Sequence, residues 1–144
     1  MRPLSNSYFR LSVIYSLVGL GIGLMMVSVD DHSQMPTHAH IMLIGFIVMF
    51  MFGAFYRLYP AAEKGVLPVL HFAVANLSFV AFMVGFWLIY EGNPELGESF
   101  TAPSTTIFIF NHLLFAWIVF RATSNRHQGV GGSFSPGDIP KGDG

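Results

Sequence analysis

Residues 37–60 read THAHIMLIGFIVMFMFGAFYRLYP, and this stretch decides the fold. It opens on two histidines, His38 and His40, and continues as an apolar run up to Arg57. A run of about 20 apolar residues is long enough to cross the hydrocarbon core of a bilayer as a helix. An ionisable side chain near the end of such a span costs free energy unless it has a partner, so it indicates a functional site. Two imidazoles in one short motif point first to a bound metal or haem.

The rest of the chain extends this interpretation to a membrane protein with several spans. Of its 144 residues, 53% are hydrophobic and 10% are charged, against about 25% charged residues in an ordinary soluble domain. The apolar stretches predict an all-α, polytopic four-helix bundle with spans at about 11–29, 40–59, 66–90 and 104–120. We expect one transmembrane domain, residues 1–122, and a disordered tail, residues 123–144, rich in Gly, Pro and Ser. Because residues 1–7 are polar, no cleavable signal peptide is expected.

The distribution of charge predicts the orientation of the spans. All 7 Lys and Arg lie at the N-terminus, in the loop between spans two and three, or at the C-terminus. The other two loops contain no Lys or Arg and carry five acidic residues: Asp30, Asp31, Glu91, Glu95 and Glu98. The positive-inside rule then places both termini in the cytoplasm, and we expect a bacterial inner-membrane protein. No basic patch suits nucleic acid, and the lack of cysteine excludes disulfides, thiolate ligands and covalent haem attachment.

The two histidines of span two fall on different faces of a helix. His38 shares an inward stripe with Met42, Gly45, Gly53 and Tyr56 at helical spacing. His40 lies about 200° away, so on a regular helix the two imidazoles do not bind one ion. They would share one side only if residues 37–40 stayed extended. Met42, one turn after His38, is a candidate thioether ligand.

Spans three and four carry further polar groups inside the membrane. His71 lies near the start of span three, and Asn111 and His112 lie near the middle of span four. A polar pair at mid-membrane is costly to bury without partners. Asn111 is therefore a candidate for a hydrogen bond to a bound group or its ligand, and so is Tyr56.

Depth along the spans predicts which histidines meet. We count depth from the proline that opens each span, with a rise of roughly 1.5 Å per residue. On this count the depths of His40 and His112 differ by about one helical turn. Axial ligands of one haem need similar heights on facing helices, so these two are expected to pair. His71 lies roughly 28 Å from the outer end of span three, too deep for His38 or His40, but it faces His112 with a modest mismatch.

Part of the sequence resembles known haem–copper proteins. The segment His38-Ala39-His40-x-Met42-Leu43-x-Gly45-Phe46, with Gly53 further on, resembles the His-x-His segment of NnrS-type membrane proteins. Extended to Tyr56 and Pro60, it is similar to the second helix of haem–copper oxidase subunit I, in the branch of nitric-oxide reductases and C-type oxidases. The resemblance covers roughly residues 8–60.

The resemblance implies that a histidine of span two binds haem b. It leaves His38 and His40 as alternatives, and the second axial ligand would come from His112, His71 or another subunit. The later helices of that family, which hold the copper ligands and the active-site haem ligand, have no counterpart in this sequence. The catalytic O₂ or NO site is therefore not implied, and whether the chain is an enzyme stays open.

We therefore expect a membrane haem b-binding protein that serves electron transfer or NO/O₂ sensing. One alternative is a copper or zinc site near the outer face, with ligands from Asp30, Asp31, His32, His38 and His40. Another is an accessory or assembly subunit of a respiratory complex, in which buried polar groups only join helices. Four helices enclose little interior, and Gly19-x-x-x-Gly23 permits close helix packing. A homo-oligomer or a complex with other respiratory membrane subunits is therefore expected.

Overall fold

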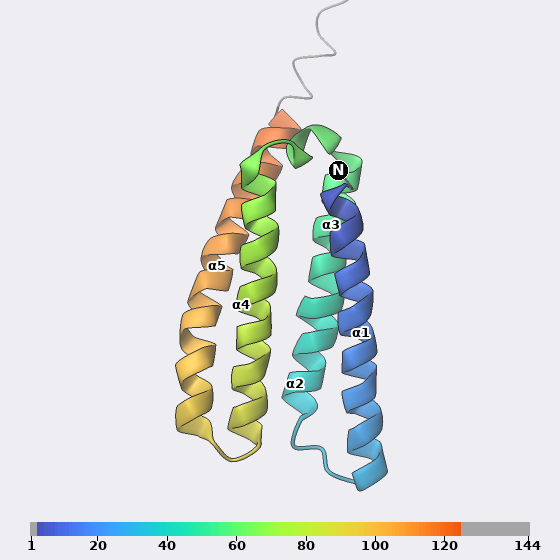
Figure 1. The fold of residues 1–144 in the computed structure, drawn as a ribbon, viewed down its shortest axis with the longest axis vertical. Coiled ribbons are helices and arrows are strands. Elements are labelled where there is room, and N and C mark those ends of the chain that lie inside the picture. Colours follow the sequence, from blue (N-terminus) through green and yellow to red (C-terminus); the bar gives the residue numbers. More distant parts are fainter. Residues whose placement is uncertain (1–2, 125–144) are drawn as a thin grey trace, which may run out of the picture.

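The computed structural model describes residues 3–124, which are almost entirely helical. In chain order the elements are α1 (Leu4–Val29), α2 (Met35–His40), η1 (Ile41–Val48), α3 (Met49–Leu58), η2 (Pro60–Glu63), α4 (Val66–Tyr90) and α5 (Pro94–Ser124). The segments α2, η1 and α3 form one continuous rod, so the chain makes four long helical rods side by side (Figure 1). Each of the four is long and apolar enough to cross a membrane. The predicted all-α fold with four candidate membrane spans is confirmed.

The four rods are arranged as two hairpins. In the first hairpin α1 packs along α2, η1 and α3, and in the second α4 packs along α5 (Figure 1). Contacts within each hairpin are much denser than contacts between them. The second hairpin closes on two glycines: a Cβ at Gly85 would lie 2.7 Å from the carbonyl oxygen of Gly97. Larger side chains, many of them aromatic, fill the space between the hairpins.

The Gly19-x-x-x-Gly23 face is covered within the first hairpin. A Cβ at Gly19 would lie 2.7 Å from the sulfur of Met42, and one at Gly23 would lie 3.0 Å from Cε1 of His38. The glycines therefore let α2 and η1 approach α1, which confirms their role in close helix packing. The face is not left open for a second copy of the chain.

Span two begins where the sequence predicts. Pro36 lies in the first turn of α2, where a missing backbone N–H costs nothing, so His38 and His40 are helical and do not lie on an extended segment. After them the helix widens into the π-helical segment η1. Such wide turns are frequent at functional sites, and the sequence pattern does not predict this one, although Gly45 lies within it.

The fourth helix begins earlier in the chain than the predicted span four. The expected loop at residues 92–101 is mostly helix, because α5 begins at Pro94 and continues through Pro103 to Ser124. Pro94 suits a first helical turn as well as Pro103 does, and proline inside a membrane helix is tolerated when nearby hydroxyls bond the backbone. Ser104, the next residue, donates its hydroxyl to the carbonyls of Phe100 and Thr101 in the same turn. The expected domain boundary at residue 122 lies inside α5, and the expected tail beyond residue 124 lies outside the described residues.

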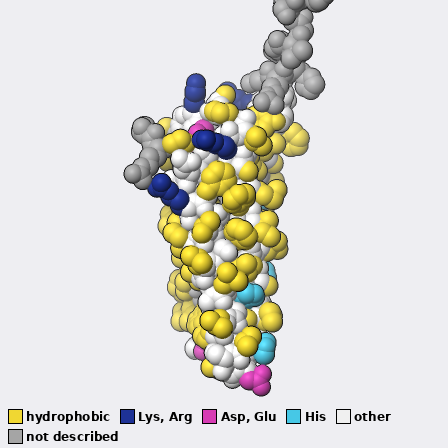
Figure 2. Space-filling model, turned by 90° about the vertical axis from the view of Figure 1, so that its right-hand side faces the viewer, with side chains coloured by type: hydrophobic (Ala, Val, Ile, Leu, Met, Phe, Trp, Pro, Cys, Tyr) yellow, Lys and Arg dark blue, Asp and Glu magenta, His cyan; other side chains and the backbone are white. Residues whose placement is uncertain are grey.

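Charged side chains of the described chain gather at the two ends of the bundle (Figure 2). The basic end is the end that carries Arg10, Arg57, Lys64 and Arg121, and the acidic end is the end that carries Asp30, Asp31, Glu91, Glu95 and Glu98. Both ends of the described chain lie at the basic end (Figure 1).

Between the two ends the outer surface is apolar. Leu17, Leu24 and Leu77 are 64%, 72% and 73% exposed. A continuous exposed apolar belt on helices of this length suits lipid tails and not water. The surface therefore agrees with a lipid bilayer as the surroundings of the bundle.

Candidate functional site: two histidine regions

The structure places the intramembrane histidines in two separate regions. The α2 pair, His38 and His40, lies toward the acidic end. The His71 cluster lies toward the basic end and consists of Tyr8, Phe52, Tyr56, His71, Asn111, His112 and Phe115. The two regions differ in what bonds each imidazole.

His40 lies between the two hairpins with one ring nitrogen engaged. Its Nδ1 is 2.8 Å from the carbonyl oxygen of Pro36. A carbonyl only accepts, so Nδ1 carries the proton and Nε2 of the neutral ring keeps its lone pair. The ring is half-buried and meets Phe86 and Phe82 of α4 edge-on, with centroids 4.7 and 5.7 Å apart. His40 thus presents a ligating nitrogen among aromatic walls.

His38 points to the opposite side, into the first hairpin. Its Nδ1 is 2.8 Å from the carbonyl oxygen of Gly19 on α1, so here too Nδ1 donates and Nε2 keeps its lone pair. The ring lies against Gly23 of α1. A Cβ added at Gly23 would lie 3.0 Å from Cε1 of the ring. The two imidazoles leave α2 on different faces, as the helical phase predicts.

A buried glutamine fixes the start of α2 against the second hairpin. Gln34 is 2% exposed, and its Nε2 donates to the carbonyl of Trp87 at 3.3 Å and to Glu91 Oε1 at 3.1 Å. Its Oε1 accepts from the hydroxyl of Thr37 at 2.7 Å. Gln34 therefore links the start of α2, the helix that carries His40, to the end of α4.

The loop before α2 carries one perturbed carboxylate. Asp31 Oδ1 accepts from the backbone N–H of Ser33 at 2.9 Å. This hydrogen bond favours the charged form and lowers the pKa of Asp31 below its ordinary value.

His71 is fully enclosed and bonded by side chains from two other helices. Its Nδ1 lies 2.8 Å from the hydroxyl of Tyr8 on α1 and 3.1 Å from the hydroxyl of Tyr56 on α3. Phe115 of α5 stacks on the ring at 5.1 Å, and Phe52 of α3 meets it edge-on at 4.7 Å. The Nε2 atom is buried without a hydrogen-bond partner among the residues that the structure describes. His71 therefore ties the two hairpins together.

Asn111 and His112 complete this region from α5. Asn111 is 3% exposed, and within residues 3–124 neither its amide nitrogen nor its amide oxygen finds a partner. His112 donates from Nδ1 to the carbonyl of Phe108 at 3.0 Å, one turn earlier in the same helix. Its ring contacts Phe52 at 5.4 Å, so Phe52 touches both His71 and His112. These two histidines do lie at a similar height.

The predicted pairing of His40 with His112 is wrong in depth. His112 contacts Phe52, and the helical rise from His40 to Phe52 is roughly 18 Å, not the single turn that the sequence indicated. The error comes from span four: because α5 begins at Pro94 and not near Pro103, His112 lies deeper than the count predicts.

The predicted outer metal site is not assembled within one chain. Among residues 3–124 no three His, Asp or Glu side chains come together in a way that would hold a metal ion. This set includes Asp30, Asp31, His32, His38 and His40 in full. Of the other candidates, Met42 packs its sulfur on Gly19 of α1, and Tyr56 bonds His71 and not a histidine of α2.

The donor chemistry fits one axial ligand of a haem, but not two from one chain. A haem-ligating histidine binds through one ring nitrogen while the other donates to a carbonyl or carboxylate, and His38, His40 and His112 all have that arrangement. No second imidazole of the described chain faces His38 or His40 at the same height.

Sequence reasoning missed Tyr8 as a partner of His71, and missed Gln34 altogether. Tyr8, Tyr56 and His71 each lie near the basic end of their spans, so a count of depth brings them to one level. That count was available from the sequence. Gln34 lies in a loop, where a polar residue carries no such signal.

No family model matches this chain, and no curated protein or solved structure gives a significant match. The resemblance of residues 8–60 to haem–copper oxidase subunit I and to NnrS-type proteins therefore stays a prediction.

Proposed function

We propose that this chain is a haem b-binding subunit of a membrane redox complex, with His40 as an axial ligand. The observation that carries the proposal is the Nδ1–H bond of His40 to the Pro36 carbonyl, which leaves the Nε2 lone pair for a metal. Phe82 and Phe86 border the ring with apolar faces suited to a flat macrocycle. His38 has the same tautomer, but its ring is packed on Gly23 inside a hairpin and has less space around it.

The second axial ligand is proposed to come from another copy of the chain or from another subunit. His71 and His112 lie roughly 18 Å further along the bundle, beyond the reach of one haem held by His40. A haem carries two anionic propionate groups, and the acidic end of the described chain has no Lys or Arg to bind them. A partner that supplies both a ligand and cationic contacts accounts for these two facts together.

When bound, the haem would supply one-electron transfer, or it would sense NO or O₂ by exchange of the second axial ligand. The chain's own part is to hold and surround it. Gln34 fixes the first turn of α2 against α4, and the phenylalanines exclude water from the imidazole. Burial and the bond at Nδ1 are among the features that set the reduction potential of such a site.

We further propose that the basic end faces the cytoplasm of a bacterium and that the chain lies in the inner membrane. All basic residues of the described chain lie at one end, as the positive-inside rule requires of short loops. Reporter fusions within residues 59–65 should report a cytoplasmic location. A periplasmic signal from that loop would reverse the orientation.

The proposal is tested on the full chain, produced in a haem-replete host and purified in a mild detergent. We expect a Soret band in the absorption spectrum and sharp bands of a low-spin haem after reduction with dithionite. Native mass spectrometry should find the haem in an assembly of more than one chain. A wild-type protein without a Soret band would contradict haem binding, and a low-spin haem held by a single chain would contradict the external ligand.

An accessory subunit without cofactor is the second candidate function. It is favoured by the bonds from His38 to Gly19 and from Tyr8 to His71, which join helices in the way structural polar groups do. On this proposal the purified assembly carries no haem, and replacement of His40 changes stability alone.

A further inference from the structure

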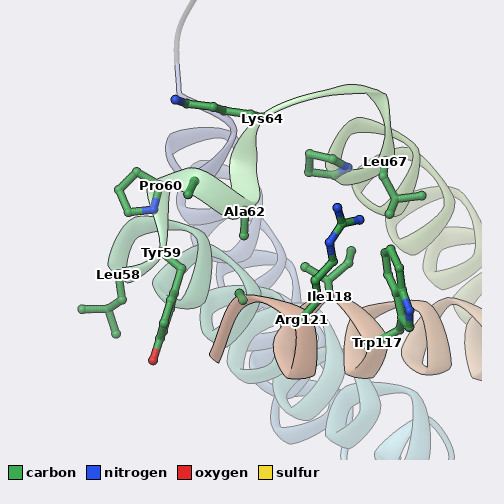
Figure 3. Close-up of a pocket in the computed structure, with 12 residues that line it drawn as sticks. Leu58, Tyr59, Pro60, Ala62, Lys64, Leu67, Trp117, Ile118 and Arg121 are labelled. Atoms are coloured by element: carbon green, nitrogen blue, oxygen red, sulfur yellow. The ribbon is translucent and has the colours of Figure 1, made fainter. Parts of the chain in front are cut away.

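A cavity of about 490 Å³ opens at the basic end, beside the His71 cluster and far from the α2 pair. It lies where four elements meet: the end of α3, the short helix η2, the start of α4 and the end of α5 (Figure 3). Its volume is within the range of small-molecule sites, about 300–1,000 Å³. None of the residues that line it is a histidine, so it is independent of the proposed haem ligand.

The cavity joins an apolar floor to a cationic side chain. Leu67 and Ile118 supply apolar surface, and Arg121 extends its guanidinium into the centre of the space (Figure 3). The guanidinium carbon lies 5.2 Å from the centroid of the Trp117 ring, a contact that restrains the arginine. Lys64 lies at the rim with its amine turned outward, on a flexible four-carbon stem.

The remaining charges around the cavity also favour an anion. The helix α4 begins beside it, and the residue before its first turn, Gly65, has no side chain to cap the free N–H groups. Such uncapped N–H groups attract negative charge. Glu63 is the only acidic residue at this end of the described chain, and its Oε1 accepts from the backbone N–H of Ser5.

We infer that this cavity binds the head group of an anionic phospholipid. The phosphodiester would lie against the Arg121 guanidinium, with Lys64 closing over it, and the first methylenes of an acyl chain would lie on Leu67 and Ile118. The position supports a lipid: the cavity is at the end of the apolar belt, where head groups meet the helix ends. Basic pockets between membrane helices recognise anionic head groups in this way.

Trp117 lines the cavity and provides the probe. The chain has 2 tryptophans, so Trp87→Phe leaves Trp117 as the only one. The bond from Gln34 to residue 87 uses the backbone carbonyl and survives this change. The full-length Trp87→Phe protein is reconstituted into phosphatidylcholine vesicles that contain brominated phosphatidylglycerol or, in a parallel sample, brominated phosphatidylcholine. Bromine quenches tryptophan fluorescence on contact.

We expect brominated phosphatidylglycerol to quench Trp117 several-fold more effectively than brominated phosphatidylcholine at equal content. Arg121→Gln should reduce that preference about fivefold, the factor expected for one basic group near a membrane surface, and Lys64→Gln should reduce it less. Arg57→Gln is the matched control, because Arg57 lies at the same end but does not line the cavity.

Three results would overturn the inference. They are equal quenching by the two lipids, a preference unaffected by Arg121→Gln, and an equal loss in the Arg57→Gln control, which would indicate general surface charge. Inorganic phosphate is added to the aqueous phase in a further arm. If it abolishes the preference, the cavity is a site for free phosphate and not for lipid.

Discussion

The α2 pair and the His71 cluster place the same kind of side chain in opposite situations. His40 bonds one backbone carbonyl within its own helix, is half-buried and keeps a lone pair in the space between the hairpins. His71 bonds two tyrosine hydroxyls from other helices and has no exposed surface. Both satisfy the need of an intramembrane imidazole for a partner, but His40 bonds a carbonyl of its own helix, whereas His71 bonds side chains of two other helices.

This difference teaches that burial alone does not identify a functional histidine in a membrane. A fully enclosed imidazole with side-chain partners serves to join helices, as His71 joins α1 and α3 to α4. A ring that bonds only a local carbonyl contributes little to the fold, so its position needs another reason. We therefore assign a structural role to His71 and propose His40 as the ligand of the cofactor.

The largest effect on stability is expected at His71. His71→Phe would leave the hydroxyls of Tyr8 and Tyr56 buried without their partner, at a cost of about 3 kcal/mol in the free energy of unfolding. Unfolding in sodium dodecyl sulfate measures this loss, and the haem content of the folded fraction should stay unchanged. The triple variant with Tyr8→Phe and Tyr56→Phe should recover most of the stability, because no polar atom is then orphaned. If the triple variant is as unstable as the single one, hydrogen bonding is not the reason.

A smaller effect is expected at His112, whose bond to Phe108 is local to α5. His112→Phe should lower the free energy of unfolding by about 1 kcal/mol and leave any low-spin spectrum intact, because His112 is too far from His40 to share a haem. The spectrum of the purified variant is the measurement. Loss of the low-spin bands in this variant would instead support His40 and His112 as ligands of one haem, as the sequence alone suggested.

The sequence predicts well the features that depend on composition and on one helix at a time. The apolar runs give four spans, Pro36 gives the start of α2, and the helical phase separates the faces of His38 and His40. The start of α5 is missed because Pro94 and Pro103 are equally good first-turn residues, and only packing against α4 decides between them.

The candidate site shows the same limit. The sequence identifies which imidazoles lie in the membrane, but the pairing of histidines depends on heights in neighbouring spans. Because the sequence count placed the start of the last helix too late, it placed His112 at the height of His40 and paired the two. A depth count brings Tyr8 and His71 to one level, but the bond from Gln34 to Glu91 joins a loop to a distant helix, and no local pattern encodes it.

The smallest effect is expected in the loop that precedes the α2 pair. The pKa of Asp31 is lowered by the Ser33 N–H, so its carboxylate stabilises the folded state above the ordinary carboxyl pKa. That contribution is lost as the pH falls through the lowered pKa of the folded state. Asp31→Asn should therefore differ slightly from the wild type near pH 7 and not at all in strong acid. Thermal unfolding of the variant and the wild type at the two pH values measures the difference in stability. A difference that is larger in acid than near pH 7 would contradict a lowered pKa of Asp31 in the folded state.

The central claim, that His40 and not the His71 cluster holds the cofactor, is tested most directly by one absorption measurement. The Soret absorbance per chain of the full-length His40→Ala protein is compared with that of the wild type, both purified from the same haem-replete host. His32→Ala, a histidine in the loop before α2, serves as the matched control. The account predicts that the band is lost or loses its low-spin form in His40→Ala and is unchanged in His32→Ala. A wild-type band that persists unaltered in His40→Ala would contradict it.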